Sequence, residues 1–261
     1  MIVSKLPKRK KVSINRFVKK SSKFLLNGEW KGLGNFLASE MVNIVNDNNI
    51  IQNERKIYCS LCNYSSSSFL HKSNSLGISW NSACPYCDSR SRHRGLIFIY
   101  QKYLNIQEGK KILHFAPEPL LEYEIRQYKV HDYYTTDYKM ENVDFPKEDV
   151  QNLNFQTSTF DFLLSNHVLE HVQDDKKAVA EMSRVLKPGG IAIITVPGDW
   201  RRNYTKVFSH LNFNGHYRDY GLDIINILRP NFVKVIKYSL YKNNGEMYAI
   251  KPSEVAFICI K

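Results

Sequence analysis

The sequence predicts an α/β protein whose main domain is a doubly wound, mostly parallel sheet, preceded by a small metal-binding segment. Two observations carry this prediction. Residues 160–197 have the pattern of strand, helix and strand, which is the repeating unit of a parallel sheet with helical crossovers. Upstream lie two pairs of cysteines with the spacing of a zinc site.

The composition fits a globular chain. Hydrophobic residues make up 43% and aromatic residues 13%, which is enough to fill a core. No apolar run reaches the length of a membrane span, and lysine and arginine interrupt the N-terminus where a secretory signal needs an apolar stretch. We therefore expect a cytoplasmic protein.

The net charge of +12 belongs mostly to the N-terminal tail. Residues 1–28 hold nine lysines and arginines and no acid, whereas the remaining chain has 28 basic and 25 acidic residues. A nearly balanced body predicts no nucleic-acid partner. The tail is expected to be a solvated, mobile arm, and the alternative is peripheral contact of residues 5–26 with an anionic membrane surface.

The expected organisation has three parts. Residues 1–50 form the basic tail and a helix over 32–45, whose apolar positions recur every three or four residues. Residues 51–108 form the zinc-ribbon segment and a linking helix over 95–104. Residues 109–261 form the sheet domain.

The zinc site is predicted from Cys59, Cys62, Cys84 and Cys87. Two C-x2-C turns offer four thiolates, which suits tetrahedral zinc. The alternatives are two disulfides or four reduced core cysteines, and a cytoplasmic location argues against disulfides. Four protein ligands leave no open position, so the zinc would be structural. Cys259 lies in an apolar strand and is expected in the core.

A cationic cluster follows the second cysteine pair. Arg90, Arg92, His93 and Arg94 stand at the start of the linking helix, where cations oppose the helix dipole. The pattern favours either recognition of a phosphate or carboxylate on a substrate, or salt bridges to the sheet domain.

The sheet domain is expected to begin with a strand over 110–115, a helix over 120–128 and a strand over 132–136 that ends at Asp137. An acid about 20 residues after the first turn is the position that hydrogen-bonds a ribose in such sheets. The alternative is a turn-forming aspartate.

The clearest unit is the strand over 160–164, the helix over 174–186 and the strand over 191–196. Lys187–Gly190 is expected to end the helix with a glycine cap. Ligands bind beyond the carboxyl ends of parallel strands, here near 165–170 and 197–200. Residues 232–240 and 255–260 are expected to close the sheet as an antiparallel terminal hairpin.

The stretch FDFLLSNHVLEHV, with RVLKPGGIAIITVP after the helix, resembles the class I S-adenosylmethionine-dependent methyltransferases. CPYCDSRSRHR ahead of it is similar to a bacterial subgroup with an N-terminal zinc ribbon, some of whose members look linked to cell-surface polysaccharide synthesis. The resemblance covers about residues 57–261. It implies a Rossmann-like fold, S-adenosyl-L-methionine as methyl donor, and O-methylation of a small or carbohydrate-type acceptor. Arg218 is a candidate to bind an anionic acceptor, and the alternative is an ion pair in the neighbourhood of Asp219.

The resemblance also implies the donor contacts. The family's first loop has the pattern acid-x-Gly-x-Gly, from which this chain departs, with His114 at the acid, Ala116 at the first glycine and Glu118 at the second. The remaining implied contacts are the ribose ligand Asp137, Asp149 and Val150 beside the adenine, and Asn166 at the end of the strand that begins at 160.

His167–His171 has the H-x-x-E-H pattern of a class of zinc peptidases. We expect no metal there, because that motif needs both histidines on one helix and His167 ends a strand. His167 instead is a candidate general base for a hydroxyl acceptor, since an ordinary histidine pKa near ~6.5 suits that task. His216 and Tyr217 are rival candidates, and His171 is expected to orient or pack.

Two alternatives to this enzyme stay open. One is a non-catalytic module whose donor loop at 114–118 no longer binds. The other is an RNA methyltransferase that uses the zinc ribbon and residues 90–94 to hold nucleic acid.

Overall fold

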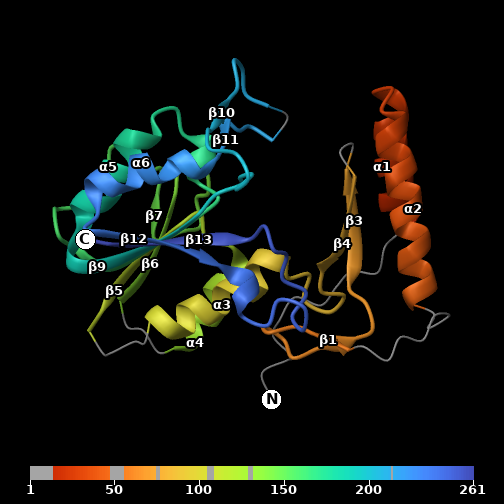
Figure 1. The fold of residues 1–261 in the computed structure, drawn as a ribbon, viewed down its shortest axis with the longest axis horizontal. Helices are drawn as coiled ribbons and strands as arrows, with labels where there is room; N and C mark the ends of the chain where they lie inside the picture. The colour runs from red at the N-terminus through yellow and green to blue at the C-terminus, as the bar shows by residue number, and fades with distance from the viewer. Residues whose placement is uncertain (1–13, 48–55, 75–76, 105–108, 129–131, 213) are drawn as a thin grey trace. The chain divides into compact units, whose positions relative to one another are not determined.

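The structure is a computed structural model that describes residues 14–47, 56–74, 77–104, 109–128, 132–212 and 214–261 (Figure 1). The chain divides into two compact units. Unit 1 comprises Met1–Phe98 and Tyr241–Lys251, and unit 2 comprises Ile99–Leu240 and Pro252–Lys261. This division differs from the expected boundary at 108/109, because a segment near the C-terminus returns to unit 1.

Unit 1 begins with a helix where a mobile arm was expected. Helix α1 covers Ile14–Leu26, so that prediction is wrong for this stretch. Residues 1–13 lie outside the described residues, and membrane contact through residues 5–26 stays a prediction. Among the helices that the structure describes, none has the length and apolarity to cross a bilayer. The further elements are α2 (Trp30–Asp47), β1 (Ile57–Tyr58), β2 (Ser65–Ser66), β3 (Leu70–Asn74) and β4 (Gly77–Ala83). Helix α3 (Ser91–Tyr103) begins in unit 1 and continues into unit 2 from Ile99.

Helix α2 packs through polar side chains as well as apolar ones. Phe36 is buried, but Leu37 and Met41, which were expected on the apolar face, are 39% and 67% exposed. The Asn43 amide instead pairs with the backbone of His71 in β3. Asn43 Nδ2 donates to His71 O (3.2 Å) and His71 N donates to Asn43 Oδ1 (2.8 Å). The side-chain amide thus satisfies strand groups that burial would otherwise leave unpaired.

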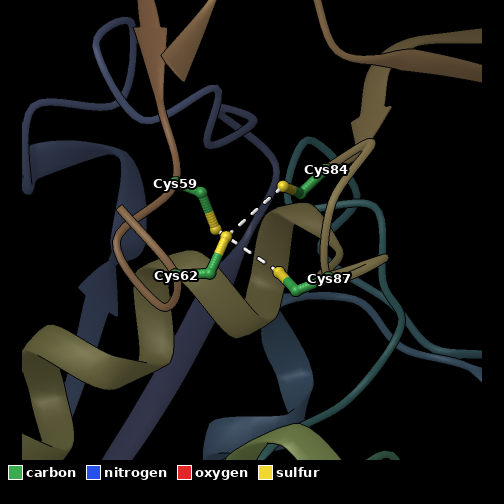
Figure 2. Close-up of side chains that lie close together, drawn as sticks. All are labelled: Cys59, Cys62, Cys84 and Cys87. Carbon is green, nitrogen blue, oxygen red and sulfur yellow. Dashed lines mark hydrogen bonds between the residues drawn. The ribbon is translucent and has the colours of Figure 1, made fainter. Parts of the chain in front are cut away.

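The two cysteine turns of unit 1 have the same backbone geometry, and their sulfurs converge (Figure 2). In each turn the first cysteine N–H donates to the carbonyl five residues later, at 2.8 Å and 3.0 Å. Its carbonyl accepts from the residue four positions later, at 2.9 Å in both turns. Those later residues, Asn63 and Asp88, both have φ of 57°, a left-handed conformation that Asn and Asp tolerate well.

Arg94 holds unit 1 together from its interior. Its side chain is fully buried, and its guanidinium lies 5.0 Å from the centre of the Phe69 ring. All three of its nitrogens donate to backbone carbonyls, at 2.7 Å for Nε and 2.7 and 3.1 Å for Nη2. The accepting carbonyls belong to Asn81, Ser89, Tyr248 and Ala249. The segment 241–251 is therefore fastened to the cysteine turns.

Unit 2 confirms the predicted mostly parallel sheet. Its described strands form one seven-stranded sheet in the order β12-β13-β9-β8-β5-β6-β7, and all its neighbours pair in parallel except those of β13. The last strand lies between β9 and β12, so it is inserted into the sheet rather than added at its edge. The strands are β5 (Lys111–Phe115), β6 (Asp132–Asp137), β7 (Phe145–Pro146), β8 (Phe160–Asn166), β9 (Leu186–Thr195), β12 (Lys234–Ser239) and β13 (Val255–Ile260).

Helices cover both faces of this sheet. Figure 1 shows α5 (Asp175–Val185) and α6 (Ile225–Leu228) together on one side and α4 (Pro119–Gln127) on the other. Asp174 caps α5, accepting from Lys177 N at 3.0 Å. The glycine cap expected at Lys187–Gly190 is wrong. The residue after α5, Leu186, is already extended, with φ −79° and ψ 139°, and it starts β9. The register shift opposite Phe160 and Phe162 accommodates the two glycines.

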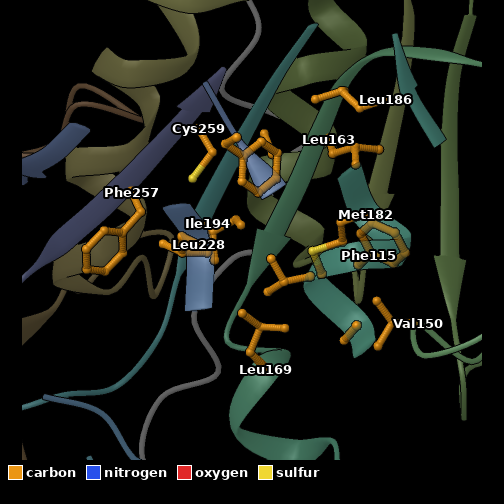
Figure 3. Close-up of a cluster of buried hydrophobic side chains, with 14 of the residues drawn as sticks. Phe115, Val150, Leu163, Leu169, Met182, Leu186, Ile194, Leu228, Phe257 and Cys259 are labelled. Atoms are coloured by element: carbon orange, nitrogen blue, oxygen red, sulfur yellow. The ribbon is translucent and has the colours of Figure 1, made fainter. Parts of the chain in front are cut away.

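The core of unit 2 lies between α5, α6 and the sheet (Figure 3). Val179 and Met182 on α5 belong to one buried cluster with Leu163 and Ile194 of the central strands, and all four are fully buried. Cys259 is buried in the same core, as predicted. Removing apolar side chains of this size from water contributes about 2 kcal/mol each, so this packing holds the carboxyl edge of the sheet in place.

Candidate active site and metal centre

A cavity of about 470 Å³ opens at the carboxyl edge of the sheet in unit 2. It lies where β5 and β8 are neighbours but continue into connections on opposite sides, which is the switch point where ligands bind in such sheets. Residues following β5, β6 and β8 line it, together with 148–151, 171–173 and Tyr217.

Two left-handed residues create the opening. Ala116 follows β5 with φ 48°, and His167 follows β8 with φ 54°. The Ala116 N–H donates to Thr136 O of β6 (2.8 Å), whereas the His167 N–H donates to Thr195 O of β9 (2.9 Å). The backbone after β5 therefore turns toward β6 and the backbone after β8 turns toward β9, so the space between these two turns stays open. Ala116 stands where the resembled family has glycine, and it has a conformation that glycine adopts most easily.

Asp137 lies at the end of β6 and lines the cavity. Its Oδ1 accepts from the backbone N–H groups of Lys139 and Met140, the latter at 2.7 Å. These bonds fix the loop and the carboxylate together. Its Oδ2 accepts no hydrogen bond from the residues that the structure describes, so this oxygen is left to accept from a hydroxyl in the cavity.

Asp149 and Val150 form another part of the wall. Val150 presents an apolar surface and is itself almost fully buried. Asp149 Oδ1 accepts from Gln151 N (2.9 Å) and from Gln151 Nε2 (3.1 Å). Gln151 Oε1 in turn accepts from Asp174 N (2.8 Å) at the start of α5. The adenine contact implied for Asp149 would therefore compete with Gln151 for the carboxylate.

His114 and Asn166 lie inside the domain, away from the cavity wall. Asn166 Nδ2 donates to Tyr100 Oη (2.8 Å) and lies 3.3 Å from His114 Nε2, which must therefore accept. His114 Nδ1 then carries the proton and donates to Tyr133 Oη (2.7 Å). Burial lowers the pKa of His114 to about 4. Direct donor contact, implied for both residues, is not available from these positions.

Glu118, the third loop residue expected to contact the donor, is the N-cap position of α4. It is half-buried and does not line the cavity. Of the three loop residues, Ala116 alone reaches the wall, and it does so through the turn described above.

His167 forms a pair with a buried glutamate. His167 lines the cavity, and its Nδ1 lies 3.1 Å from Oε1 of Glu170, whose side chain is fully buried. Because the carboxylate oxygen accepts, Nδ1 carries the hydrogen and the lone pair of the neutral ring is on Nε2. The sequence pattern predicts a role for His167 but gives no signal of its partner, although Glu170 is three residues away.

His216, which belongs to a loop distant in the sequence, lies beside the same glutamate, Glu170. Glu170, His171 and His216 each offer a ligand atom, and these atoms lie within 4.8 Å of one another. The rings of His171 and His216 pack edge to face, with their centroids 4.7 Å apart. Burial lowers the pKa of His216, while the negative charge of Glu170 opposes that shift. The expectation for His171 was orientation or packing alone, and the structure brings it into a cluster of potential metal ligands.

Arg218 supports this cluster rather than the cavity. Its buried guanidinium donates to the carbonyls of Leu169 (3.0 Å), Val172 (2.9 Å) and Gln173 (2.7 Å) and lies 3.4 Å from the Asp175 carboxylate. An anionic acceptor, considered from the sequence, would have to displace these contacts. The guanidinium instead fixes the segment that carries residues 170 and 171.

The four cysteines of unit 1 have the geometry of a metal centre (Figure 2). Sγ of Cys59 lies 3.6 Å from Sγ of Cys87, and Sγ of Cys62 lies 3.7 Å from Sγ of Cys84. Tetrahedral zinc with bonds of ~2.3 Å places sulfurs ~3.8 Å apart, whereas a disulfide needs ~2.05 Å. None of the five cysteines forms a disulfide. Hydrogen bonds from the neighbouring thiols, Cys62 first, lower the pKa of Cys59 and favour its thiolate.

Sequence comparison matches part of unit 2 to a known family. Residues 120–194 match the family model described as a methyltransferase domain. A norajmaline N-methyltransferase from Rauvolfia serpentina is 43% identical over 54 residues, which is 21% of this chain and 18% of that protein. A demethylmenaquinone methyltransferase from Staphylococcus epidermidis is 39% identical over 54 residues, or 21% and 22% of the two chains. The chain thus spans about a fifth of the length of these curated relatives.

Solved structures are similar to this chain at low sequence identity. The [4+2]-cyclase SpnF is 15% identical, with a TM-score of 0.47 and coverage of 67% of this chain and 82% of that one. The 1,6-didemethyltoxoflavin-N1-methyltransferase of Burkholderia thailandensis is 16% identical, with a TM-score of 0.47 and coverage of 66% and 78%. Within this Rossmann-like fold, residues 120–194 are similar to a methyltransferase domain.

Proposed function

We propose that this chain is an S-adenosylmethionine-dependent methyltransferase that methylates a hydroxyl of a small acceptor, with carbohydrate-type compounds as one such class. The observation that carries the proposal is the cavity at the switch point between β5 and β8, with Ala116, Asp137 and His167 around one opening. The match of residues 120–194 to a methyltransferase domain supports it independently.

The cavity suits a cationic, ribose-bearing donor. Its walls carry three carboxylates, those of Asp137, Glu148 and Asp149, against the single ammonium of Lys139. This excess of negative charge favours a ligand that carries sulfonium and ammonium groups. Oδ2 of Asp137 is placed to accept from a ribose hydroxyl, and Val150 offers the apolar surface that an adenine needs. The volume of about 470 Å³ is in the usual range for a small-ligand site.

The donor supplies an activated methyl group, so the residues of this chain mainly orient the acceptor and remove its proton. His167 is proposed as the general base. Its Nε2 carries the lone pair, and its Nδ1–H is held by Glu170 at 3.1 Å. A buried carboxylate in that position fixes the tautomer and stabilises the imidazolium that forms when the ring accepts the proton, as in other His–carboxylate pairs.

Binding of S-adenosylhomocysteine, measured by calorimetry, tests the donor site. In Asp137→Asn the affinity is expected to fall about tenfold to a hundredfold. The amide retains one oxygen for Lys139 and Met140 but replaces the accepting Oδ2, and a hydrogen bond to a charged group is worth about 1.5–3 kcal/mol.

Asp132→Asn is the matched control, because Asp132 begins the same strand at its opposite end. Its affinity is expected to equal that of the unmodified protein. No detectable binding at millimolar ligand would rule out the proposed donor site and favour a non-catalytic module, whereas equal losses in both variants would contradict the ribose contact proposed for Asp137.

We further propose that the four cysteines of unit 1 hold a structural zinc ion. The support is the tetrahedral sulfur spacing and the matched pair of backbone turns, each of which aims two thiols at one point. With four protein ligands the zinc has no open position for chemistry. Metal analysis is expected to give one equivalent of zinc bound by cysteine, and less than half an equivalent would contradict the proposal.

A further inference from the structure

We propose that Glu170, His171 and His216 form a second metal site, for a divalent first-row transition metal ion, beside the cavity of unit 2. Their ligand atoms lie within 4.8 Å of one another. Two imidazoles and one carboxylate on one side of an ion leave its other positions open to water or to a ligand from the cavity.

The environment of His171 favours this role. The His171 ring lines the cavity and is exposed. Its Nδ1 lies 3.0 Å from the carbonyl oxygen of Gly215, which can only accept, so Nδ1 carries the hydrogen and Nε2 has the lone pair. Metal-binding histidines commonly donate their other N–H to a carbonyl in this way, which fixes the ring and raises its basicity.

Glu170 provides the second, independent observation. Its side chain has no exposed surface, and Oε1 is held by His167. Its Oε2 is buried and has no hydrogen-bond partner among the residues that the structure describes. A buried carboxylate oxygen without a partner is costly, and a bound cation would remove that cost.

The surrounding backbone holds the three ligands in place. Tyr217 N donates to Glu170 O (2.8 Å), which brings the segment that carries His216 alongside residues 170 and 171. Arg218, from the same segment, binds the carbonyls of residues 169, 172 and 173. The segments that carry the three ligands are therefore joined to each other by several hydrogen bonds. A rigid set of ligands binds metal more tightly than a mobile one.

The ligand set favours zinc, iron, cobalt or nickel over calcium and magnesium, which prefer oxygen ligands throughout. It uses Glu170 and His171 of the H-x-x-E-H string, but His216 from a distant loop takes the place of His167. The proposed site therefore differs from the peptidase motif in both its ligands and its geometry.

A role in catalysis rests on the function proposed above. A bound ion would coordinate the acceptor hydroxyl and lower its pKa. The proton passes to Nε2 of His167, the oxygen forms its bond to the methyl carbon, and the carbon–sulfur bond of the sulfonium donor breaks to leave a neutral thioether. The existence of the site does not depend on this step.

Cobalt(II) is a suitable probe because its visible absorption reports the ligands. Cobalt is added to the full chain after its cysteine site has been filled with one equivalent of zinc. One further equivalent is expected to bind, with d–d bands and without the sulfur-to-cobalt charge-transfer band of a thiolate site. Affinity is expected to fall about a hundredfold in His216→Ala and in His171→Ala, since each removes one of three ligands.

His210→Ala is the matched control, because His210 is exposed on the same loop and outside the cluster. It is expected to bind cobalt as the unmodified protein does. Absence of a second equivalent, a thiolate-type spectrum, or equal affinity in all variants would overturn the metal site. Binding of S-adenosylhomocysteine is measured on the same samples and is expected to be unchanged in His216→Ala. Loss of that binding in every sample, with cobalt still bound, would overturn the proposed function and leave the metal site standing.

Discussion

Histidines of unit 2 differ in role because they differ in burial. His114 is fully buried, with each ring nitrogen facing a specific polar neighbour. His167 reaches the cavity and pairs with a carboxylate. The resemblance to a known family implied a donor contact for His114, and the end of its strand made His167 a candidate base, because position along the chain does not reveal which way a side chain points. His114 lies within the buried strand β5, whereas His167 is the first residue after β8 and reaches the cavity.

Acid is expected to destabilise unit 2 through His114. Its pKa of about 4 lies below the usual 6.5, so the unfolded chain binds the proton more readily than the folded chain. The stability that comes from the neutral ring is present above pH 6.5 and is lost as the pH falls toward 4, by up to about 3 kcal/mol. His114→Gln lacks this titration, so its deficit relative to the unmodified protein is expected to shrink over that range in urea unfolding.

Parallel pH profiles for the two proteins would contradict a neutral, buried His114. If the variant does not fold, the ring can be titrated in the unmodified protein by NMR. A pKa near 6.5 for His114 in that experiment would be equally damaging.

Among the elements of unit 1, the cysteine turns and the segment 241–251 depend on one side chain. Arg94 binds carbonyls from both, although they are more than 150 residues apart in the sequence. From sequence alone, the cluster at residues 90–94 indicated anion recognition or salt bridges to the sheet domain. For Arg94 the structure shows a different role, in which backbone dipoles surround a buried cation. The RNA alternative thereby loses one of the charges on which it depended.

Arg94→Lys is expected to destabilise unit 1 by about 3 kcal/mol or more. Lysine retains the charge, but its single ammonium cannot satisfy carbonyls that a planar fork reaches from several directions, and buried acceptors are left unpaired. Chemical unfolding monitored in unit 1 provides the measurement. Arg90→Lys is the control, since Arg90 is partly exposed in the same cluster. Equal stability of the two variants would show that the buried contacts of Arg94 contribute little.

Across the entire chain, two units each have their own stabilising centre. Unit 2 has a large apolar core between its helices and sheet. The described part of unit 1 consists of helices, short strands and the cysteine turns, so a bound metal would add stability where the apolar core is smaller. The family match falls within unit 2, and it does not describe what unit 1 does.

Loss of zinc is expected to unfold the cysteine turns and leave the donor site intact. Cys87→Ala should bind about one equivalent of zinc less than the unmodified protein and expose the turns to proteolysis, because metal binding and folding are coupled in such segments. Its affinity for S-adenosylhomocysteine should be unchanged, since the proposed donor contacts belong to unit 2. Cys259→Ala is the control, because Cys259 lies in the core of unit 2, and it should keep its zinc. Full zinc content in Cys87→Ala would contradict the site.

Local patterns in the sequence were sufficient to predict most elements of the sheet domain. Short apolar runs and three-to-four spacing located β5, β6, β8, α5 and β13 to within a few residues, and the C-x2-C spacing located four sulfurs that the structure brings together. These features depend on neighbours in the chain, so a pattern of residue types is enough to predict them.

Only the tertiary structure shows which of the candidate site residues lie in the same site. It put His114, Asn166, Arg94 and Arg218 into interiors, and it brought His216 to Glu170 and His171. Such contacts join residues far apart in the sequence, and they depend on how loops cross the end of a sheet. Burial and pairing then decide what each side chain can do, because a charged or titratable group behaves differently once water is removed from it.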